Sequence, residues 1–291
     1  MQKLGKQSSL GLLCKLINSF RIVFKMHSKY AVALLLALAA SGCASHLGGL
    51  SRMASVSGGQ IEIIRTTKFD LVSASASSSM ASEVLRVYIE GDGKAWSTRF
   101  QPSTDPSPRN LFVANLALSD SVPSVYLARP CQFHRPTACG IAIWTDGRFS
   151  DPVIQSFHEA LDKLKARHRP RSFELIGYSG GGYIALLLAG ERTDVSQLQT
   201  IAGNLDPEAW ALHHELSPML GLKDLGALSR LKTLPQRHFV GTKDKVVPPE
   251  LVDAFVSTNK LRCATVTRVA ASHESGWSGL ANSLDVKLKC R

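Results

Sequence analysis

The sequence lacks several patterns that would indicate a specialised class of protein. Its 291 residues contain no internal repeat of fixed period, which argues against solenoid and propeller architectures. Hydrophobic residues make up 44% of the chain and charged residues 20%, so neither a disordered nor a fibrous protein is expected. The six cysteines form no C-x-x-C pair and the histidines show no paired ligand spacing, so no metal site is expected.

The formal net charge of +11 does not indicate nucleic-acid binding. Residues 1–42 carry six basic side chains and no acidic one; without them the chain has 28 basic and 23 acidic residues, a net charge of +5. The one local basic run, at 163–171, ends a predicted helix, where cations complement the helix dipole. No nucleic-acid-binding motif accompanies this run, and no nucleic-acid partner is expected.

Residues 1–42 have the layout of a secretory export segment. Lys29 precedes an apolar run at 30–40 that is too short to span a bilayer, and small residues follow it. Residues 40–43 (ASGC) resemble the lipobox of bacterial lipoproteins, which implies that Cys43 becomes a lipidated N-terminus. Ordinary cleavage nearby, with Cys43 incidental, is the alternative. Residues 1–25 exceed what a signal peptide needs, as expected if Met26 is the true start.

The stretch that follows is expected to link a lipid anchor to a folded domain. Residues 43–59 are rich in Ser and Gly and predict a flexible tether. Ala44 follows Cys43, and the lack of Asp there, by the same resemblance, implies an outer-membrane location facing the periplasm. The remaining residues, 60–291, have the length of one large domain, and we expect a monomer.

Four cysteines fall within the predicted domain, and an even number in an exported protein points to disulfides. Three pairings are possible, and the sequence does not choose among them by itself. We favour the two pairs that each close a local loop, which are Cys131–Cys139 and Cys263–Cys290.

Short β-rich runs alternate with helical stretches from about residue 60. This alternation predicts an α/β fold with a mostly parallel, eight-stranded sheet covered by helices on both faces. Residues 206–231 are too long for a plain crossover helix and are expected to form a lid over the site. A hairpin is expected at 61–66 and 69–75, further strands at 85–89, 124–128, 173–178, 198–202, 238–241 and 264–269, and helices at 110–118, 151–167 and 180–189.

The sharpest local signal is GYSGG at 177–181, which fits the G-x-S-x-G pattern of a nucleophile elbow. By itself the pattern is short enough to occur by chance. Its context is the expected one, because an apolar strand (FELIGY) leads in and a helical stretch (YIALLLA) leads out. Such a turn exposes the hydroxyl of Ser179 and places the backbone N–H of Gly180 at a helix N-terminus, where it can bind an oxyanion.

A serine nucleophile needs a base, and this elbow requires the chain order Ser, then Asp or Glu, then His. Asp244 follows the strand predicted at 238–241, and His273 follows the last predicted strand. We therefore predict that His273 takes the proton of Ser179 and that Asp244 orients His273. Asp206, past the preceding strand, is a rival acid. His213 and His214, inside the predicted lid, are not expected to take part.

A second oxyanion donor is expected from the loop after strand 85–89, which reads EGDG at 90–93. Its glycines would let the backbone turn N–H groups inward, and the N–H of Asp92 or of Gly93 is the candidate. An ordinary Asp-Gly turn is the alternative interpretation.

The strand order, elbow, acid and base together resemble the α/β-hydrolase superfamily over nearly all of residues 60–290. More narrowly, the segments VYIEGDGKAW, LARPCQF, WTDGRFS and GYSGGG look like a group of bacterial α/β-hydrolase-like lipoproteins of poorly defined function. The resemblance implies the fold and the triad roles of Ser179, Asp244 and His273, and it names no substrate.

Three functions are compatible with this sequence. The first is cleavage of an ester, thioester or related acyl bond of a small molecule through an acyl-serine intermediate. The second is peptidase action by the same triad, and the third is an inactive hydrolase scaffold that binds a partner in the envelope. No cofactor is expected, because a Ser-His-Asp triad generates its own nucleophile.

Overall fold

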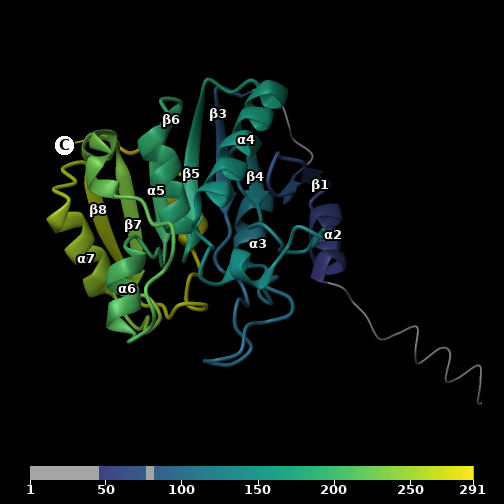
Figure 1. Ribbon diagram of the computed structural model, residues 1–291. Helices are drawn as coiled ribbons and strands as arrows, with labels where there is room; N and C mark the ends of the chain where they lie inside the picture. The colour runs from purple at the N-terminus through teal and green to yellow at the C-terminus, as the bar shows by residue number, and fades with distance from the viewer. Residues whose placement is uncertain (1–45, 77–81, 291) are drawn as a thin grey trace, which may run out of the picture. The chain divides into compact units, whose positions relative to one another are not determined.

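The computed structural model describes residues 46–76 and 82–290, and the export segment and Cys43 lie outside these residues. The described chain forms an eight-stranded sheet with the strand order β1-β2-β4-β3-β5-β6-β7-β8 (Figure 1). The strands are β1 (Gln60–Ile64), β2 (Leu71–Ser75), β3 (Val84–Ile89), β4 (Ser124–Leu127), β5 (Ser172–Tyr178), β6 (Val195–Ile201), β7 (Gln236–Gly241) and β8 (Ala264–Val269).

The predicted parallel sheet with an antiparallel start is confirmed. Strands β1 and β2 form an antiparallel hairpin, and β2 pairs antiparallel with β4. All pairings from β4 through β3 to β8 are parallel. Because these strands run in the same direction, their carboxyl ends lie at one edge of the sheet, and the loops that follow them lie together there.

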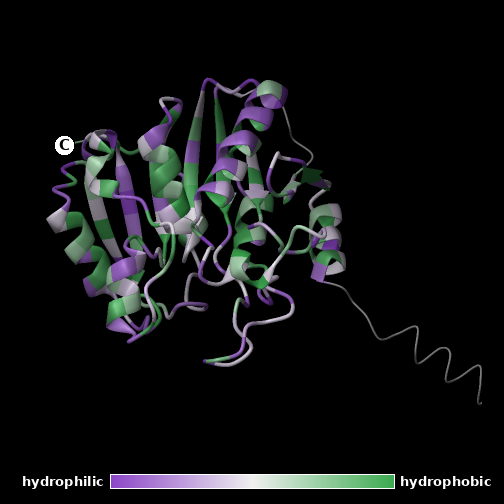
Figure 2. Ribbon diagram, in the orientation of Figure 1, coloured by the Kyte–Doolittle hydropathy of each residue, from purple (hydrophilic) through white to green (hydrophobic). Residues whose placement is uncertain are grey.

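Helices cover both faces of the sheet, as predicted, because the strands have apolar side chains on both sides. In β3, Leu85, Val87 and Ile89 belong to one buried cluster, and Tyr88 belongs to the other. Helices α4 (Asp151–His168), α5 (Gly181–Glu191) and α7 (Pro249–Thr258) pack on the first face. Helices α2 (His46–Val56), α3 (Phe112–Leu118) and α8 (Leu280–Leu284) pack on the second. Helix α5 is apolar along most of its length (Figure 2), and nine of its residues are buried.

The predicted flexible tether is wrong for residues 46–56, which form helix α2. Leu50 and Ala54 are fully or almost fully buried, and both belong to the cluster that contains α3 and Tyr88. The Gly and Ser residues that suggested a linker occupy other positions of the helix. Its apolar side chains, four residues apart, face the body of the protein, because positions i and i+4 share one side of a helix.

Both disulfides form with the favoured pairing. Cys131 is bonded to Cys139, with 5.7 Å between the Cα atoms, and Cys263 is bonded to Cys290, with 4.5 Å. The first closes a short loop after β4, and the second joins the start of β8 to the C-terminal segment. Among the described residues, no helix combines the length and the apolar character of a membrane span.

The segment predicted as a lid contains the short helix α6 (Pro207–His213) and the 3-10 turns η2 (Leu225–Ala227) and η3 (Ser229–Lys232). Its second half packs on the body, where Leu225 and Leu231 are buried in the same cluster as α5. Its first half is more exposed, and 80% of the Leu212 surface is accessible. Movement of this segment stays a prediction.

Candidate active site

A sharp turn between β5 and α5 presents Ser179. The serine has a φ of 49°, in the left-handed region that non-glycine residues seldom adopt, which is typical of a nucleophile elbow. The flanking glycines are required by space. A Cβ at Gly177 would lie 2.5 Å from the carbonyl oxygen of Gly181, and a Cβ at Gly181 would lie 2.5 Å from that of Ile89. The elbow therefore depends on glycine at both positions.

The structure brings Ser179, His273 and Asp244 into one hydrogen-bonded row. His273 Nε2 lies 2.9 Å from Ser179 Oγ, and His273 Nδ1 lies 2.8 Å from Asp244 Oδ2. The three side chains come from the loops after β5, β8 and β7, which meet at the carboxyl edge of the sheet. This geometry allows His273 to accept a proton from the serine while the aspartate fixes the other ring nitrogen.

Asp244 is held rigidly on the side away from His273. Its Oδ1 accepts hydrogen bonds from the backbone N–H groups of Val246, at 2.8 Å, and Val247, at 2.9 Å. Its side chain is completely inaccessible to solvent, whereas that of His273 is 12% exposed. A buried carboxylate with satisfied hydrogen bonds is well placed to stabilise a positive imidazolium.

Two aromatic side chains fix the loop that carries His273. Tyr178 donates its hydroxyl hydrogen to the carbonyl oxygen of His273 at 3.0 Å, and Trp277 Nε1 donates to the same oxygen at 3.1 Å. The Tyr178 ring also lies 5.4 Å from the imidazole, centroid to centroid. Sequence reasoning did not single out either role, because Tyr178 is the variable residue of the elbow pattern and Trp277 is four residues past the histidine.

The rival acid, Asp206, lies in a different position. It is the N-cap of α6, where its Oδ1 accepts a hydrogen bond from the Ala209 N–H at 3.0 Å. His214 lies 2.9 Å from the carbonyl oxygen of Val246, through its Nε2, and is not part of the hydrogen-bonded row. Asp244 is thus the acid that contacts His273.

The residues predicted to supply oxyanion donors lie beside the hollow that Ser179 faces. Gly180, Asp92 and Gly93 line the same hollow as the serine, and within residues 46–76 and 82–290 their backbone N–H groups donate to no protein acceptor. Gly91 is packed against the serine, since a Cβ there would lie 3.0 Å from the Ser179 Cβ. The free N–H groups of Gly180, Asp92 and Gly93 are suited to binding a negatively charged oxygen.

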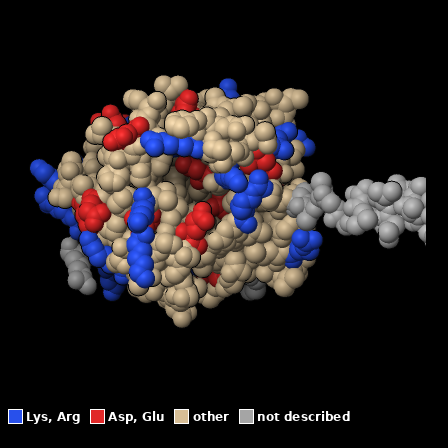
Figure 3. Space-filling view, turned by 90° about the horizontal axis from the view of Figure 1, so that it is seen from below, with Lys and Arg blue, Asp and Glu red and all other residues tan. Residues whose placement is uncertain are grey.

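The hollow at Ser179 has a volume of about 820 Å³, enough for a small organic molecule. Figure 3 views the molecule from the edge where the strands end; acidic side chains lie in the hollowed face, and Lys and Arg side chains border it. The lining combines aromatic side chains (Trp96, Phe112, Tyr178 and Trp210) with charged ones (Glu90, Asp92, Lys94, Arg109, Arg148 and Glu274).

Glu90 is an unexpected buried acid beside this hollow. Its Oε1 accepts the Gly91 N–H at 2.9 Å, and its Oε2 accepts the Tyr126 hydroxyl at 2.9 Å. Burial raises the pKa of Glu90 to about 7, against the smaller opposing effects of these hydrogen bonds and of Arg129. The sequence signal that could have identified Glu90 is an acidic residue at the end of an apolar strand.

Asp92 forms ion pairs with two buried arginines. Arg129 Nη1 lies 2.9 Å from Asp92 Oδ1, and Arg148 Nε lies 3.0 Å from Oδ2. Arg148 also lines the hollow at Ser179. Among the described residues, no group of three or more His, Cys, Asp or Glu side chains is arranged to hold a metal ion.

These features define the α/β-hydrolase fold, and the comparison with solved structures agrees. No protein-family model matches the chain, and no curated protein matches it. A cold-adapted esterase from an Arctic intertidal metagenomic library is 16% identical and covers 79% of this chain and 94% of its own, with a TM-score of 0.56.

Two further solved structures have the same arrangement. An esterase of Pyrococcus furiosus is 12% identical, with a TM-score of 0.55, over 79% of this chain and 90% of its own. A serine hydrolase without a lid from Xanthomonas campestris is 16% identical, with a TM-score of 0.51, over 78% of this chain and 91% of its own. At these identities the likeness establishes the fold alone.

Proposed function

We propose that this protein is a serine hydrolase that cleaves an ester, thioester or related acyl bond of a small molecule through an acyl-serine intermediate. The observation that carries the proposal is the hydrogen-bonded row of Ser179, His273 and Asp244 at the carboxyl edge of the sheet. A fold of this kind hosts many functions, so the function is argued from the site and not from the fold.

In the first half of the reaction, Ser179 Oγ attacks the acyl carbon of the substrate while His273 Nε2 takes the hydroxyl proton. Asp244 Oδ2, 2.8 Å from Nδ1, stabilises the imidazolium that forms. The imidazolium then gives the proton to the leaving group, and the acyl group remains on Ser179. In the second half, a water oxygen attacks the acyl carbon while His273 Nε2 takes a proton from that water. The imidazolium then gives the proton to Ser179 Oγ as the bond to the acyl carbon breaks and the acid leaves.

The negative charge that develops on the acyl oxygen requires donors that are already in place. The N–H of Gly180, at the start of α5, is one, and the N–H of Asp92 or of Gly93 is the other. Such fixed donors stabilise the transition state more than the substrate, because the charge exists only there.

A fluorophosphonate probe tests the proposal directly, because it labels a serine only when a base activates it. Residues 44–291, expressed in an oxidising compartment, should be labelled, and Ser179→Ala should not. Ser272→Ala, which changes another serine beside His273, is the matched control and should keep the label. Failure of folded wild-type protein to react would favour the inactive binding scaffold.

A panel of substrates then separates esterase from peptidase action. Hydrolysis of short acyl esters and thioesters, without hydrolysis of peptides, is the expected result. Turnover of peptides at rates comparable to those of esters would replace the proposal with peptidase action by the same triad.

We also propose that the protein is a monomer. Light-scattering chromatography should then show a single species of monomer mass.

We also propose that Cys43 carries a lipid that anchors the protein to the outer membrane, facing the periplasm. The export-segment pattern supports this proposal, as do the two disulfides, which are typical of oxidising compartments. Mass spectrometry of membrane fractions should find a lipid on Cys43, and Cys43→Ala should release the protein.

A further inference from the structure

The loop after β4 is closed by the Cys131–Cys139 disulfide and has an unusual backbone. Cys131 has a φ of 69° and Phe133 a φ of 61°, so two non-glycine residues adopt the left-handed conformation within three positions. Such residues persist where the surrounding structure determines them strongly, and they gather at functional sites. Between them stands Gln132, which is only 1% exposed.

Gln132 joins this loop to the loop that carries the oxyanion candidates. Its Nε2 donates to the carbonyl oxygen of Gly91 at 3.0 Å and to that of Pro106 at 3.4 Å. Its Oε1 accepts the backbone N–H of Arg129 at 3.0 Å. The side chain also lies close to Gly93, where a Cβ would be 2.7 Å from Nε2. Gln132 is therefore packed against residues on both sides of Asp92.

Arg129 holds Asp92 itself. The guanidinium, in a residue that is 5% exposed, binds Asp92 Oδ1 through Nη1 at 2.9 Å and donates through Nη2 to the carbonyl oxygen of Arg148. Arg148 in turn binds Asp92 Oδ2 at 3.0 Å. Both carboxylate oxygens are thus restrained, which limits rotation of the peptide that carries the Asp92 N–H.

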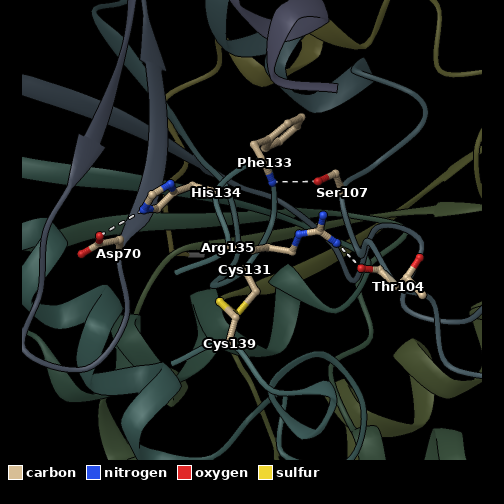
Figure 4. Close-up of a disulfide and its surroundings, with 8 residues drawn as sticks. All are labelled: Asp70, Thr104, Ser107, Cys131, Phe133, His134, Arg135 and Cys139. Carbon is tan, nitrogen blue, oxygen red and sulfur yellow. Dashed lines mark hydrogen bonds and ion pairs between the residues drawn. A yellow bond between two sulfur atoms is a disulfide. The ribbon is translucent and has the colours of Figure 1, made fainter. Parts of the chain in front are cut away.

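The disulfide-closed loop also contacts later residues of the segment between β3 and α3, and the β1–β2 hairpin (Figure 4). Phe133 donates its backbone N–H to Ser107 Oγ at 2.7 Å, and Arg135 donates to the carbonyl oxygen of Thr104. His134 Nε2 lies 3.3 Å from Asp70 Oδ2, next to β2. These contacts hold the loop that contains Gln132 against the segment at 104–107 and against the hairpin.

We propose that the loop closed by Cys131–Cys139 positions the oxyanion hole, with Gln132 and Arg129 as positioning residues that act through Gly91 and Asp92. The proposal rests on the proposed function, since it concerns the same acyl transfer. Neither side chain needs to touch the substrate. They keep the backbone donors at the place where negative charge develops on the substrate. Small displacements of such donors reduce the reaction rate strongly.

The second disulfide provides a matched control. Cys263 immediately precedes β8, whereas His273 follows the other end of that strand, so Cys263–Cys290 lies at the opposite edge of the sheet from the site. Cys131→Ser with Cys139→Ser should lower kcat for a short acyl ester on the order of 10-fold or more with little change in KM. Cys263→Ser with Cys290→Ser should keep kcat within about 2-fold at temperatures where the fold is intact.

Gln132→Leu keeps the proposal testable if the first pair of substitutions prevents folding. It removes the hydrogen bonds to Gly91 and Pro106, and kcat should fall on the order of 10- to 100-fold. The discrimination between an oxygen ester and its thionoester should also fall in this variant, because a carbonyl sulfur uses oxyanion donors poorly. A role in stability alone would leave that ratio unchanged.

The outcomes distinguish the two proposals. Wild-type protein that neither reacts with a fluorophosphonate nor hydrolyses esters would contradict the proposed function. An active wild type, together with folded Gln132→Leu protein that keeps the wild-type kcat and thionoester ratio, would overturn the positioning role and leave the hydrolase intact.

Discussion

The carboxylate of Asp92 lies against the backbone of Gly180, so the two loops that carry the proposed oxyanion donors are in direct contact. A Cβ at Gly180 would lie 2.2 Å from Asp92 Oδ1. The φ of Gly180 is −58°, which any residue can adopt, so glycine is needed there for space and not for its conformational freedom. Arg129 and Arg148 hold the carboxylate and prevent it from withdrawing without loss of its ion pairs.

Gly180→Ala should therefore disturb the oxyanion loop. The new methyl group would displace Asp92, and kcat should fall on the order of 10- to 100-fold, as expected for misplaced donors. Gly140→Ala is the control, because no atom lies within 4 Å of a Cβ there. Steady-state kinetics with a short acyl ester measure kcat for both variants. A Gly180→Ala protein with wild-type kcat would show that the contact has no bearing on turnover.

The two acids considered from the sequence should differ sharply in their effects. Asp244→Asn removes the group that orients His273, and kcat should fall by roughly 10⁴-fold, as in other Ser-His-Asp enzymes. Asp206→Ala removes only the N-cap of α6, with a loss of about 1 kcal/mol in unfolding free energy and kcat nearly unchanged. Steady-state kinetics and urea unfolding give both quantities. A larger kcat loss at Asp206 would reverse the assignment.

The buried Glu90 should make stability depend on pH. Its pKa rises from 4.5 to about 7 on folding, so the folded state binds the proton more tightly. The free energy of unfolding should fall as pH rises from about 4.5 to 7, by on the order of 1–3 kcal/mol from this group, and stay level above that range.

Glu90→Gln imitates the protonated acid and should remove this dependence. Urea unfolding at pH 5 and pH 8 measures it, with the difference between the two values expected to be smaller in the variant than in the wild type. An equal difference in the two proteins would mean that Glu90 is not the group responsible.

Helix α2 should contribute measurably to stability, contrary to the behaviour of a tether. Leu50→Ala removes a completely buried side chain and should lower the unfolding free energy by about 2–5 kcal/mol. The exposed Val56→Ala, at the end of the same helix, should change it by less than about 0.5 kcal/mol. Equal effects of the two substitutions would show that α2 is not packed in solution.

The fold was predictable because its determinants are local and periodic. The run at 85–89, for example, is apolar enough to be buried on both faces, and its strand occupies Val84–Ile89 in the structure. The main error, at residues 46–56, arose where composition and burial disagree. Gly and Ser indicate a linker, but Leu50 and Ala54 find an apolar surface that only the folded sheet and α3 create.

By itself, the sequence determined the alternation of strands and helices, the elbow at Ser179, and the order of acid and base. Each of these depends on spacing along the chain, which is visible in one dimension. Only the tertiary structure decided among the three possible disulfide pairings and between Asp244 and Asp206. Only it joined Arg129, Gln132 and Arg148 to the loop at Asp92. Those contacts link segments tens of residues apart, and they form because parallel strands bring their carboxyl ends to one edge of the sheet.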